Sequence, residues 1–289
     1  MYKIKISDFN LKQTLECGQC FNFEQVYASE SDAISECVYE YNVIAHGRRL
    51  VIRQEKEVIT FENADEAEVN NIWLDYFDLN RDYGKIKHAI IKADSALKPI
   101  VDEYYGIRIL NQEFIETLLS FIISQNKNIP GIKKIVRTIS QNFGSLIGED
   151  AGRSFYAFPN LKQLSRISEQ DFRDMKTGFR AAYLRDAVDK ITDGSICGDE
   201  LRHLPFNEAK EKLMQIRGVG DKVANCVLLF SLGFRNAFPV DVWIKRIMEE
   251  LYFHKETDKK LIERYAYEKF GEYGGYAQQY CLFMRKISS

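Results

Sequence analysis

The sequence predicts an α+β protein in which an N-terminal antiparallel β-sheet domain is followed by an all-α domain. Two observations carry this prediction. Residues 1–62 are rich in Val, Ile, Tyr and Phe and partly alternate between apolar and polar positions, which is typical of strands. Beyond residue 65, apolar residues recur at steps of three and four, which is typical of amphipathic helices. A chain of 289 residues is long enough for two domains, and we expect them to span residues 1–107 and 108–289.

The individual elements follow in order along the chain. Strands are expected in "KIKI", "FNFEQVYA", "CVYEYNVIAH" and the run from "LVIRQ" to "EVITFE", with a hairpin turn at residues 46–49. Helices are expected at residues 65–77, 85–105, 112–126 and 128–144, then at 179–194, 207–216, 221–233 and 241–252. A last pair is expected near Asp258 and Tyr273.

Composition and charge limit the class of protein. No apolar run approaches the length of a transmembrane helix, and the N-terminus does not resemble a secretory signal. Six scattered cysteines favour a reduced, intracellular protein, which we expect in the cytoplasm or nucleoid of a bacterium or archaeon, without a membrane partner. Residues 1–110 carry a net charge of −6 and residues 111–289 one of +4, so the second part is the one suited to nucleic acid.

The segment "RGVGDKVA", residues 217–224, predicts a tight turn between two helices. Gly218 and Gly220 let the backbone turn sharply and approach a partner closely. The helix that begins at Asp221 then presents its first free N–H groups, which form an anion site suited to a phosphodiester. An ordinary helix pair with a glycine turn is the alternative interpretation.

Two charged residues near this turn have the pattern of a catalytic pair. Lys222 lies in the first turn of the second helix, where a cation opposes the helix dipole. This placement favours the neutral amine that nucleophilic chemistry needs; a lysine facing phosphate or solvent is the alternative. Asp241, in "FPVDVW", lies where a helix starts, so it is either a plain N-cap or a carboxylate that stabilises positive charge on a sugar carbon. Cys226 follows Lys222 by four residues and shares its helix face.

These motifs resemble a known family. The hairpin "GVGDKVA" and the aspartate of "PVDVW" are similar to the signature of the helix-hairpin-helix superfamily of base-excision DNA glycosylases, with Arg217 where that family usually has proline. The whole chain resembles the 8-oxoguanine DNA glycosylase/lyase branch through "GQCFNF", "SFIISQNKNI", "GFRAAYL" and "YGGYAQQYCLF", which occur in the same order. The resemblance implies a bifunctional enzyme that flips 8-oxoguanine out of duplex DNA, excises it and cleaves the strand at the abasic site.

The resemblance also assigns roles to residues. It implies Lys222 as the nucleophile at C1′ and Asp241 as the stabiliser of the transition state. The Gly18 carbonyl would accept the N7 hydrogen of 8-oxoguanine, Gln278 would read the Watson–Crick edge, and Asn126 would fill the gap left in the duplex. The implied base pocket, shared with a TBP-like N-terminal domain, is Gly18, Gln19, Cys226, Gln278, Leu282 and Phe283; the implied DNA contacts are Asn126, Phe179, Arg180, Gly218, Val219, Gly220 and Trp243. Whether Leu282 or Phe283 stacks on the base is left open.

Cofactors and partners follow from the same comparison. We expect no iron–sulfur cluster, because only Cys281 lies near the C-terminus, and no metal ion at Cys17 and Cys20, because a second ligand pair is missing. A cation between the hairpin and a DNA phosphate is left open. The expected partner is double-stranded DNA containing 8-oxoguanine, bound by a monomer. A glycosylase for alkylated bases and a non-catalytic helix-hairpin-helix DNA-binding protein are the alternatives.

Three departures from the family pattern affect the expected DNA contacts. Gly131 stands where animal members have an arginine that recognises the opposite cytosine, and Phe179 stands in place of a tyrosine. We therefore expect weaker discrimination among the bases opposite the lesion. Trp243 stands where the family often has histidine, which leaves that phosphate contact open.

Overall fold

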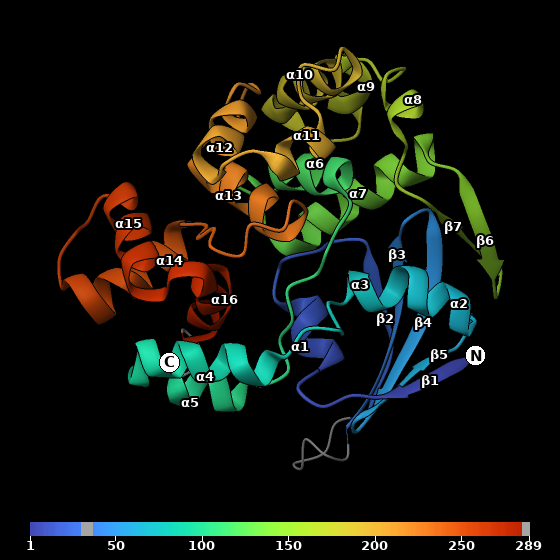
Figure 1. Ribbon diagram of the computed structural model, residues 1–289. Helices are drawn as coiled ribbons and strands as arrows, with labels where there is room; N and C mark the ends of the chain where they lie inside the picture. Colours follow the sequence, from blue (N-terminus) through green and yellow to red (C-terminus); the bar gives the residue numbers. More distant parts are fainter. Residues whose placement is uncertain (30–36, 285–289) are drawn as a thin grey trace.

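The computed structural model describes residues 1–29 and 37–284. Its N-terminal part is an antiparallel sheet in the order β1-β5-β4-β3-β2 (Figure 1). The strands are β1 (Tyr2–Lys5), β2 (Phe23–Ser29), β3 (Val38–Ala45), β4 (Arg48–Glu55) and β5 (Val58–Phe61). His46 and Gly47 between β3 and β4 both have positive φ, the conformation of a two-residue hairpin turn. The predicted sheet and its turn at residues 46–49 are therefore confirmed.

One face of this sheet is covered by short helices. They are α1 (Leu11–Glu16), α2 (Glu66–Glu68) and α3 (Leu74–Tyr76), the last two joined by a π-helical turn. Leu11 and Leu15 of α1 pack on this face together with Ile52 of β4. The buried Gln54 side chain accepts a hydrogen bond from the Leu11 N–H at 2.6 Å, which attaches the start of α1 to the sheet. The sheet therefore fixes the position of α1 and of the residues that follow its end at Glu16.

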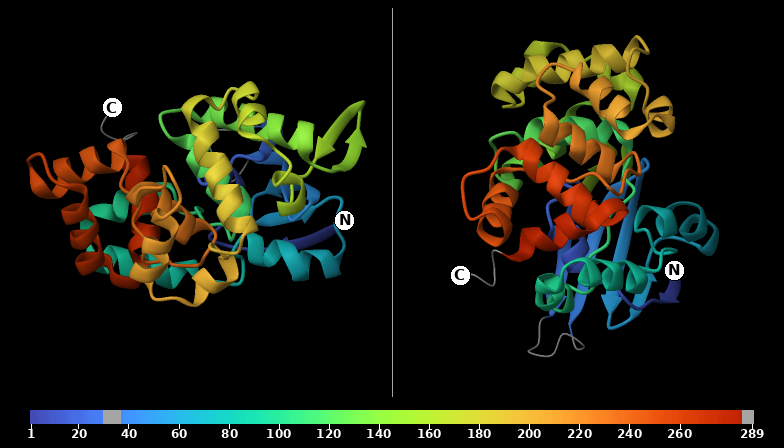
Figure 2. Two further views of the ribbon diagram at one scale, coloured as in Figure 1. Left: turned by 90° about the horizontal axis from the view of Figure 1, so that it is seen from above. Right: turned by 60° about the vertical axis from the view of Figure 1, so that its left-hand side comes forward.

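The rest of the chain is largely helical and surrounds α6 (Phe114–Ser124), whose residues 117–123 are all buried. The other helices of this part are α7 (Ile129–Phe143), α8 (Leu161–Leu164), α9 (Glu169–Asp174), α10 (Ala181–Thr192), α11 (Gly198–His203), α12 (Phe206–Met214), α13 (Asp221–Phe230), α14 (Val242–Met248), α15 (Lys259–Phe270) and α16 (Gly274–Met284). Figure 2 shows α14–α16 as a separate group beside the helices α6–α13. Within the described ranges, no helix is long and apolar enough to cross a lipid bilayer.

Two helices that precede residue 107 belong to the helical core. They are α4 (Tyr83–Ala93) and α5 (Lys98–Glu103), which pack against α15 and α16 (Figure 1). Asp94, at the end of α4, accepts a hydrogen bond from the Tyr252 hydroxyl at 2.6 Å and forms an ion pair with Lys269 at 3.1 Å. The sheet and the helices are thus joined by packing as well as by the chain, and the boundary after residue 107 stays a prediction.

The sequence analysis expected the second part to be all-α, but this largely helical part also contains two strands. It contains a hairpin of β6 (Leu146–Asp150) and β7 (Arg153–Tyr156). Arg49 of β4 forms an ion pair with Asp150 at 2.5 Å, and its guanidinium lies 4.0 Å from the centre of the Phe155 ring. Because these contacts come from β4, far away in the sequence, no local pattern predicted the hairpin. The short helices α8, α9 and α11 were also not predicted.

Glu116 of α6 generates a pH-dependent stability prediction. Its side chain is half-buried, and loss of hydration, together with the nearby Glu113 charge, raises its pKa to about 8. The folded state therefore binds a proton that the unfolded state releases, so its stability falls as the pH rises from Glu116's unfolded pKa towards 8. We expect Glu116→Gln to raise the free energy of unfolding at pH 8.5 by about 1–3 kcal/mol.

Urea denaturation of both proteins between pH 4.5 and 8.5 checks this expectation. The gain should shrink towards zero as the pH falls to 4.5, where Glu116 is protonated in the folded state and about half protonated in the unfolded state, so the measurement at low pH is the control for the one at high pH. An equal gain at both ends of the pH range would contradict the proposed titration.

Candidate active site

A glycine turn joins α12 to α13 and is held from three directions. The Val219 N–H donates to the Ile216 carbonyl at 3.0 Å, and the Arg217 N–H donates to Asp186 of α10 at 2.7 Å. Gly218 has φ +80°, and a Cβ there would lie 2.1 Å from the Tyr183 ring. The turn therefore requires glycine at 218 for both conformation and space. Gly220 is the N-cap of α13.

Lys222 projects from the first turn of α13 towards the end of α6. Its Nζ lies 3.2 Å from the Ser124 hydroxyl oxygen and 4.8 Å from the centre of the Phe121 ring. The Phe121 ring in turn stacks on Phe230 at a centroid distance of 5.5 Å. The amine is thus held by one polar and one aromatic neighbour rather than by a carboxylate. The sequence analysis singled out Lys222 but neither Ser124 nor Phe121.

Asp241 is the N-cap of α14. Its Oδ1 accepts hydrogen bonds from the Trp243 N–H at 2.9 Å and the Ile244 N–H at 2.8 Å. Both bonds go to one oxygen, so Oδ2 takes no hydrogen bond from the described part of the chain. The cap role fixes the carboxylate in place, which is compatible with a role in charge stabilisation.

Six predicted residues line one small cavity of about 60 Å³: Gly18, Lys222, Cys226, Asp241, Gln278 and Leu282. They come from the end of α1, from α13, from the start of α14 and from α16, so only the tertiary structure brings them together. Burial raises the pKa of the Cys226 thiol to about 11, which keeps it neutral as a small apolar wall. The remaining lining residues are Cys17, Phe121, Phe230, Pro239 and Gln279, none of which the sequence analysis placed in the site.

Gly18 follows the C-cap of α1 with φ +85°, the left-handed conformation that commonly ends a helix. Its neighbour Gln19, predicted for the base pocket, lies elsewhere. The buried Gln19 amide donates to the carbonyls of Thr14 and Arg108 and accepts the Leu110 N–H at 2.9 Å. These three bonds use both ends of the amide, so Gln19 holds the glycine segment in position and does not line the cavity.

Phe283 also lies outside the cavity. Its ring stacks on Tyr104 at a centroid distance of 4.2 Å, whereas Leu282 lines the cavity. Of the two residues that the sequence left open for stacking on a base, the structure therefore places Leu282 in position.

The predicted DNA contacts divide into outward and inward side chains. Phe179 is 53% exposed and Trp243 is 42% exposed. Arg180 is only 5% exposed, and its guanidinium donates to the carbonyls of Gln125 and Asn126. Arg180 thus holds the loop between α6 and α7, on which Asn126 adopts φ +52°. The expected contact of Arg180 with the opposite strand stays a prediction, and in this conformation its guanidinium is engaged by loop carbonyls.

Cys17 and Cys20 are free thiols. Burial raises the pKa of Cys17 to about 12 and that of Cys20 well above its ordinary value, so neither is a thiolate at neutral pH. Within residues 1–29 and 37–284, no group of three or more His, Cys, Asp and Glu side chains is placed to hold a metal ion.

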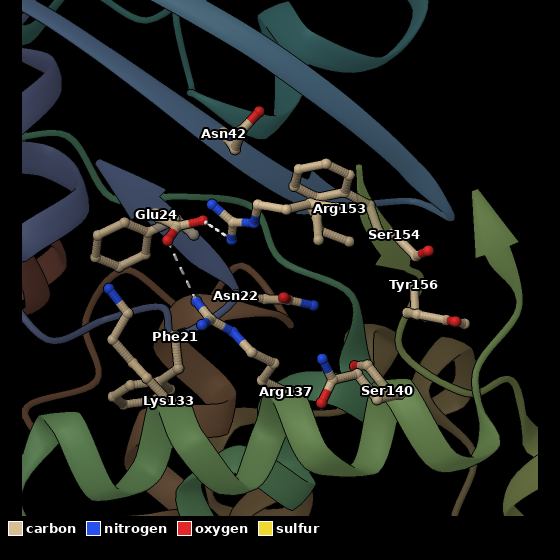
Figure 3. A pocket seen from close by; sticks show the side chains of 14 residues that line it. Phe21, Asn22, Glu24, Asn42, Lys133, Arg137, Ser140, Arg153, Ser154 and Tyr156 are labelled. Carbon is tan, nitrogen blue, oxygen red and sulfur yellow. Dashed lines mark hydrogen bonds and ion pairs between the residues drawn. The ribbon is translucent and has the colours of Figure 1, made fainter. Parts of the chain in front are cut away.

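A wider cavity of about 510 Å³ lies between α7, β2, β3 and the β6–β7 hairpin (Figure 3). Glu24 lies between two arginines there, 2.6 Å from Arg153 and 4.0 Å from Arg137. Neither Lys222 nor Asp241 lines this cavity. The residues that the sequence predicted to be catalytic are gathered in the smaller cavity of about 60 Å³, so cavity volume does not identify the candidate site.

A lysine on a glycine-turn hairpin, beside a cap aspartate and a small cavity, is typical of the class of helix-hairpin-helix DNA glycosylases. Comparisons with known proteins agree. Residues 119–272 match the family described as HhH-GPD superfamily base excision DNA repair protein, and residues 1–118 match the 8-oxoguanine DNA glycosylase, N-terminal domain. The chain belongs to the HhH-GPD superfamily, within its 8-oxoguanine DNA glycosylase family.

Individual relatives cover nearly the whole chain. N-glycosylase/DNA lyase OGG1 of Arabidopsis thaliana is 30% identical over 96% of this chain and 77% of its own length. The N-glycosylase/DNA lyase of Saccharomyces cerevisiae is 28% identical over 98% of this chain and 85% of its own length. The Clostridium acetobutylicum 8-oxoguanine glycosylase/lyase, solved with double-stranded DNA containing cytosine opposite 8-oxoG, is 40% identical with a TM-score of 0.89; the match covers 97% of this chain and 93% of that one.

The two hairpin glycines offer a matched test of the turn. Gly218→Ala places a Cβ against the Tyr183 ring at positive φ, whereas Gly220→Ala meets nothing within 4 Å. We expect Gly218→Ala to lower the free energy of unfolding by about 2 kcal/mol or more and Gly220→Ala by less than about 1 kcal/mol. Urea denaturation of both variants measures the difference. Equal losses would show that the contact with Tyr183 does not constrain the turn.

Proposed function

We propose that this chain excises 8-oxoguanine from double-stranded DNA, with Lys222 as the nucleophile and Asp241 as the electrostatic stabiliser, and then cleaves the strand at the abasic site. The observation that carries the proposal is the convergence of Lys222, Asp241, Gly18 and Gln278 on one cavity. A non-catalytic DNA-binding module would need the hairpin but not an amine and a carboxylate beside a small pocket. An alkylated-base glycosylase would not need the lysine.

The base must leave the duplex before it reaches these residues, at an unstacking cost of a few kcal/mol. Asn126, on the loop held by Arg180, is the residue we propose to enter the vacated space. The cavity of about 60 Å³ is narrow for a purine, so base entry requires lining side chains to move. Leu282 and Cys226 would then face the two sides of the base, and the Gly18 carbonyl would accept its N7 hydrogen.

The chemical steps use the amine and the carboxylate in turn. As the Lys222 amine attacks C1′, the bond from C1′ to the base breaks and its electron pair leaves with the base, which takes up a proton. Positive charge that develops on the sugar is stabilised by the Asp241 carboxylate. The amine loses its proton, the sugar ring opens with protonation of the ring oxygen, and a Schiff base joins C1′ to Lys222. Removal of a C2′ proton then expels the 3′ phosphate.

DNA is the partner that the fold and the relatives indicate. The hairpin offers the N-terminus of α13 to a phosphate, and the exposed Phe179 and Trp243 supply further contact surface. The remaining features belong to the proposal: the DNA carries 8-oxoguanine, the protein acts as a monomer inside the cell, and the reaction needs no cofactor. Whether a cation joins the hairpin to a phosphate is open.

Borohydride trapping tests the nucleophile. Mixed with duplex DNA containing 8-oxoguanine, the enzyme should form a covalent adduct that borohydride preserves, because reduction of the Schiff base fixes the amine to C1′. Lys222→Gln should abolish the adduct. Lys212→Gln, on the preceding helix and ion-paired with Glu200 at 3.8 Å, is the control and should keep it. An adduct that survives in Lys222→Gln would rule out this lysine.

Selectivity for the opposite base should be weak. Gly131 has no side chain to reach the opposite cytosine, and a Cβ there would lie 2.9 Å from the Asn128 Oδ1 that caps α7. Phe179 lacks a hydroxyl, and Arg180 is engaged by loop carbonyls. We expect excision opposite cytosine to exceed excision opposite adenine by less than about tenfold in single-turnover assays. Phe179→Tyr should increase this ratio, and a large ratio in the wild type would contradict the expectation.

A further inference from the structure

Gln279 of α16 carries a buried polar atom that the steps above do not use. Its side chain lines the catalytic cavity, and the residue is 2% exposed. The Gln279 Oε1 has no hydrogen-bond partner in the part of the chain that the structure describes. A buried carbonyl without a partner costs free energy, and native proteins keep few of them. An unpartnered acceptor on a residue that lines a ligand cavity therefore suggests a donor on the ligand.

Hydrogen bonds fix the orientation of this acceptor. The Gln279 Nε2 donates to the Gln278 Oε1 at 2.6 Å, and the Gln278 Nε2 donates to the Pro239 carbonyl at 3.3 Å. In each bond an amide nitrogen is the donor, which identifies the nitrogen and the oxygen of that amide. The chain of bonds ends at the Gln279 Oε1, which is left as an acceptor.

The free capacity of the two amides matches one kind of base edge. Gln278 keeps one N–H of Nε2 and one lone pair of Oε1, and Gln279 keeps one N–H of Nε2 and its Oε1, so the pair offers two donors and two acceptors. One of these donors and the two acceptors make up the set that cytosine presents to guanine. The guanine edge, which 8-oxoguanine shares, has one acceptor at O6 and donors at N1 and the 2-amino group. An adenine edge has no 2-amino group and would leave an acceptor unpaired.

We propose that Gln279 is a specificity-determining residue whose Oε1 accepts a hydrogen bond from the 2-amino group of the extruded base. This inference rests on the proposed function. Gln278 reads O6 and N1, and Gln279 extends that reading to the third position of the edge. The two residues together select guanine-type bases, while the Gly18 carbonyl recognises the oxidised form. Loss of the Gln279 oxygen should therefore remove only the preference for bases that carry a 2-amino group.

The test compares two bases that differ only in that group. Single-turnover excision is measured on duplexes with 8-oxoguanine or 8-oxohypoxanthine opposite cytosine; the second base lacks the 2-amino group and keeps O6, N1–H and N7–H. We expect the wild-type enzyme to remove 8-oxoguanine about tenfold faster. In Gln279→Met, which keeps the volume but not the amide, the ratio should fall to about one. The ratio is the readout because loss of the bond to Gln278 slows both reactions alike.

Tyr280→Phe is the matched control. It removes another buried polar atom without a hydrogen-bond partner on the same helix, but Tyr280 does not line the cavity. The ratio of the two excision rates in Tyr280→Phe should equal that of the wild-type enzyme. Cleavage of a preformed abasic site, which needs no base recognition, is measured for all three proteins and shows that each is folded.

Two results would overturn the inference: a wild-type ratio near one, or an unchanged ratio in Gln279→Met. Failure of the proposed substrate looks different. In that case the wild-type enzyme would cleave abasic sites but remove neither base.

Discussion

The contact between the start of α13 and the end of α6 is the constraint on which the site depends. It places the Lys222 amine 3.2 Å from the Ser124 hydroxyl and over the Phe121 ring. The same pair of helices buries Phe121 against Phe230, so the amine and the hydrophobic core share one interface. Within residues 1–29 and 37–284, no carboxylate forms an ion pair with Lys222, which is compatible with the proposed attack of its amine on a sugar carbon.

The groups proposed for catalysis also have local structural roles. Asp241 is the N-cap of α14, and that role holds its carboxylate at the cavity. Gly218 is required by the turn, and the turn in turn presents the N-terminus of α13 to a phosphate. The alternatives weighed from the sequence, cap or catalyst and turn or DNA contact, are therefore compatible rather than exclusive.

The N-terminal sheet contributes to the cavity indirectly, through the helix α1 and the glycine that follows it. Its helix α1 ends at Glu16, and the following Gly18 reaches the cavity while Gln19 is anchored by Thr14, Arg108 and Leu110. A loop that must approach a base with its backbone needs its position fixed from elsewhere, because glycine contributes no side-chain contacts of its own. The buried hydrogen bonds of Gln19 supply that support, which explains why a predicted pocket residue faces away from the pocket.

By itself, the sequence determined most of the strands and the longer helices, the glycine hairpin and the positions of Lys222 and Asp241, because hydrophobic period, turn glycines and cap residues act locally. Only the tertiary structure decided which side chains meet. Phe121 and Gln279 line the cavity from helices far apart in the chain, Ser124 contacts Lys222, and Arg180 turns inward to loop carbonyls. The β6–β7 hairpin contacts Arg49 of β4. These contacts join residues separated by tens of positions, and no periodic pattern encodes which of them become neighbours.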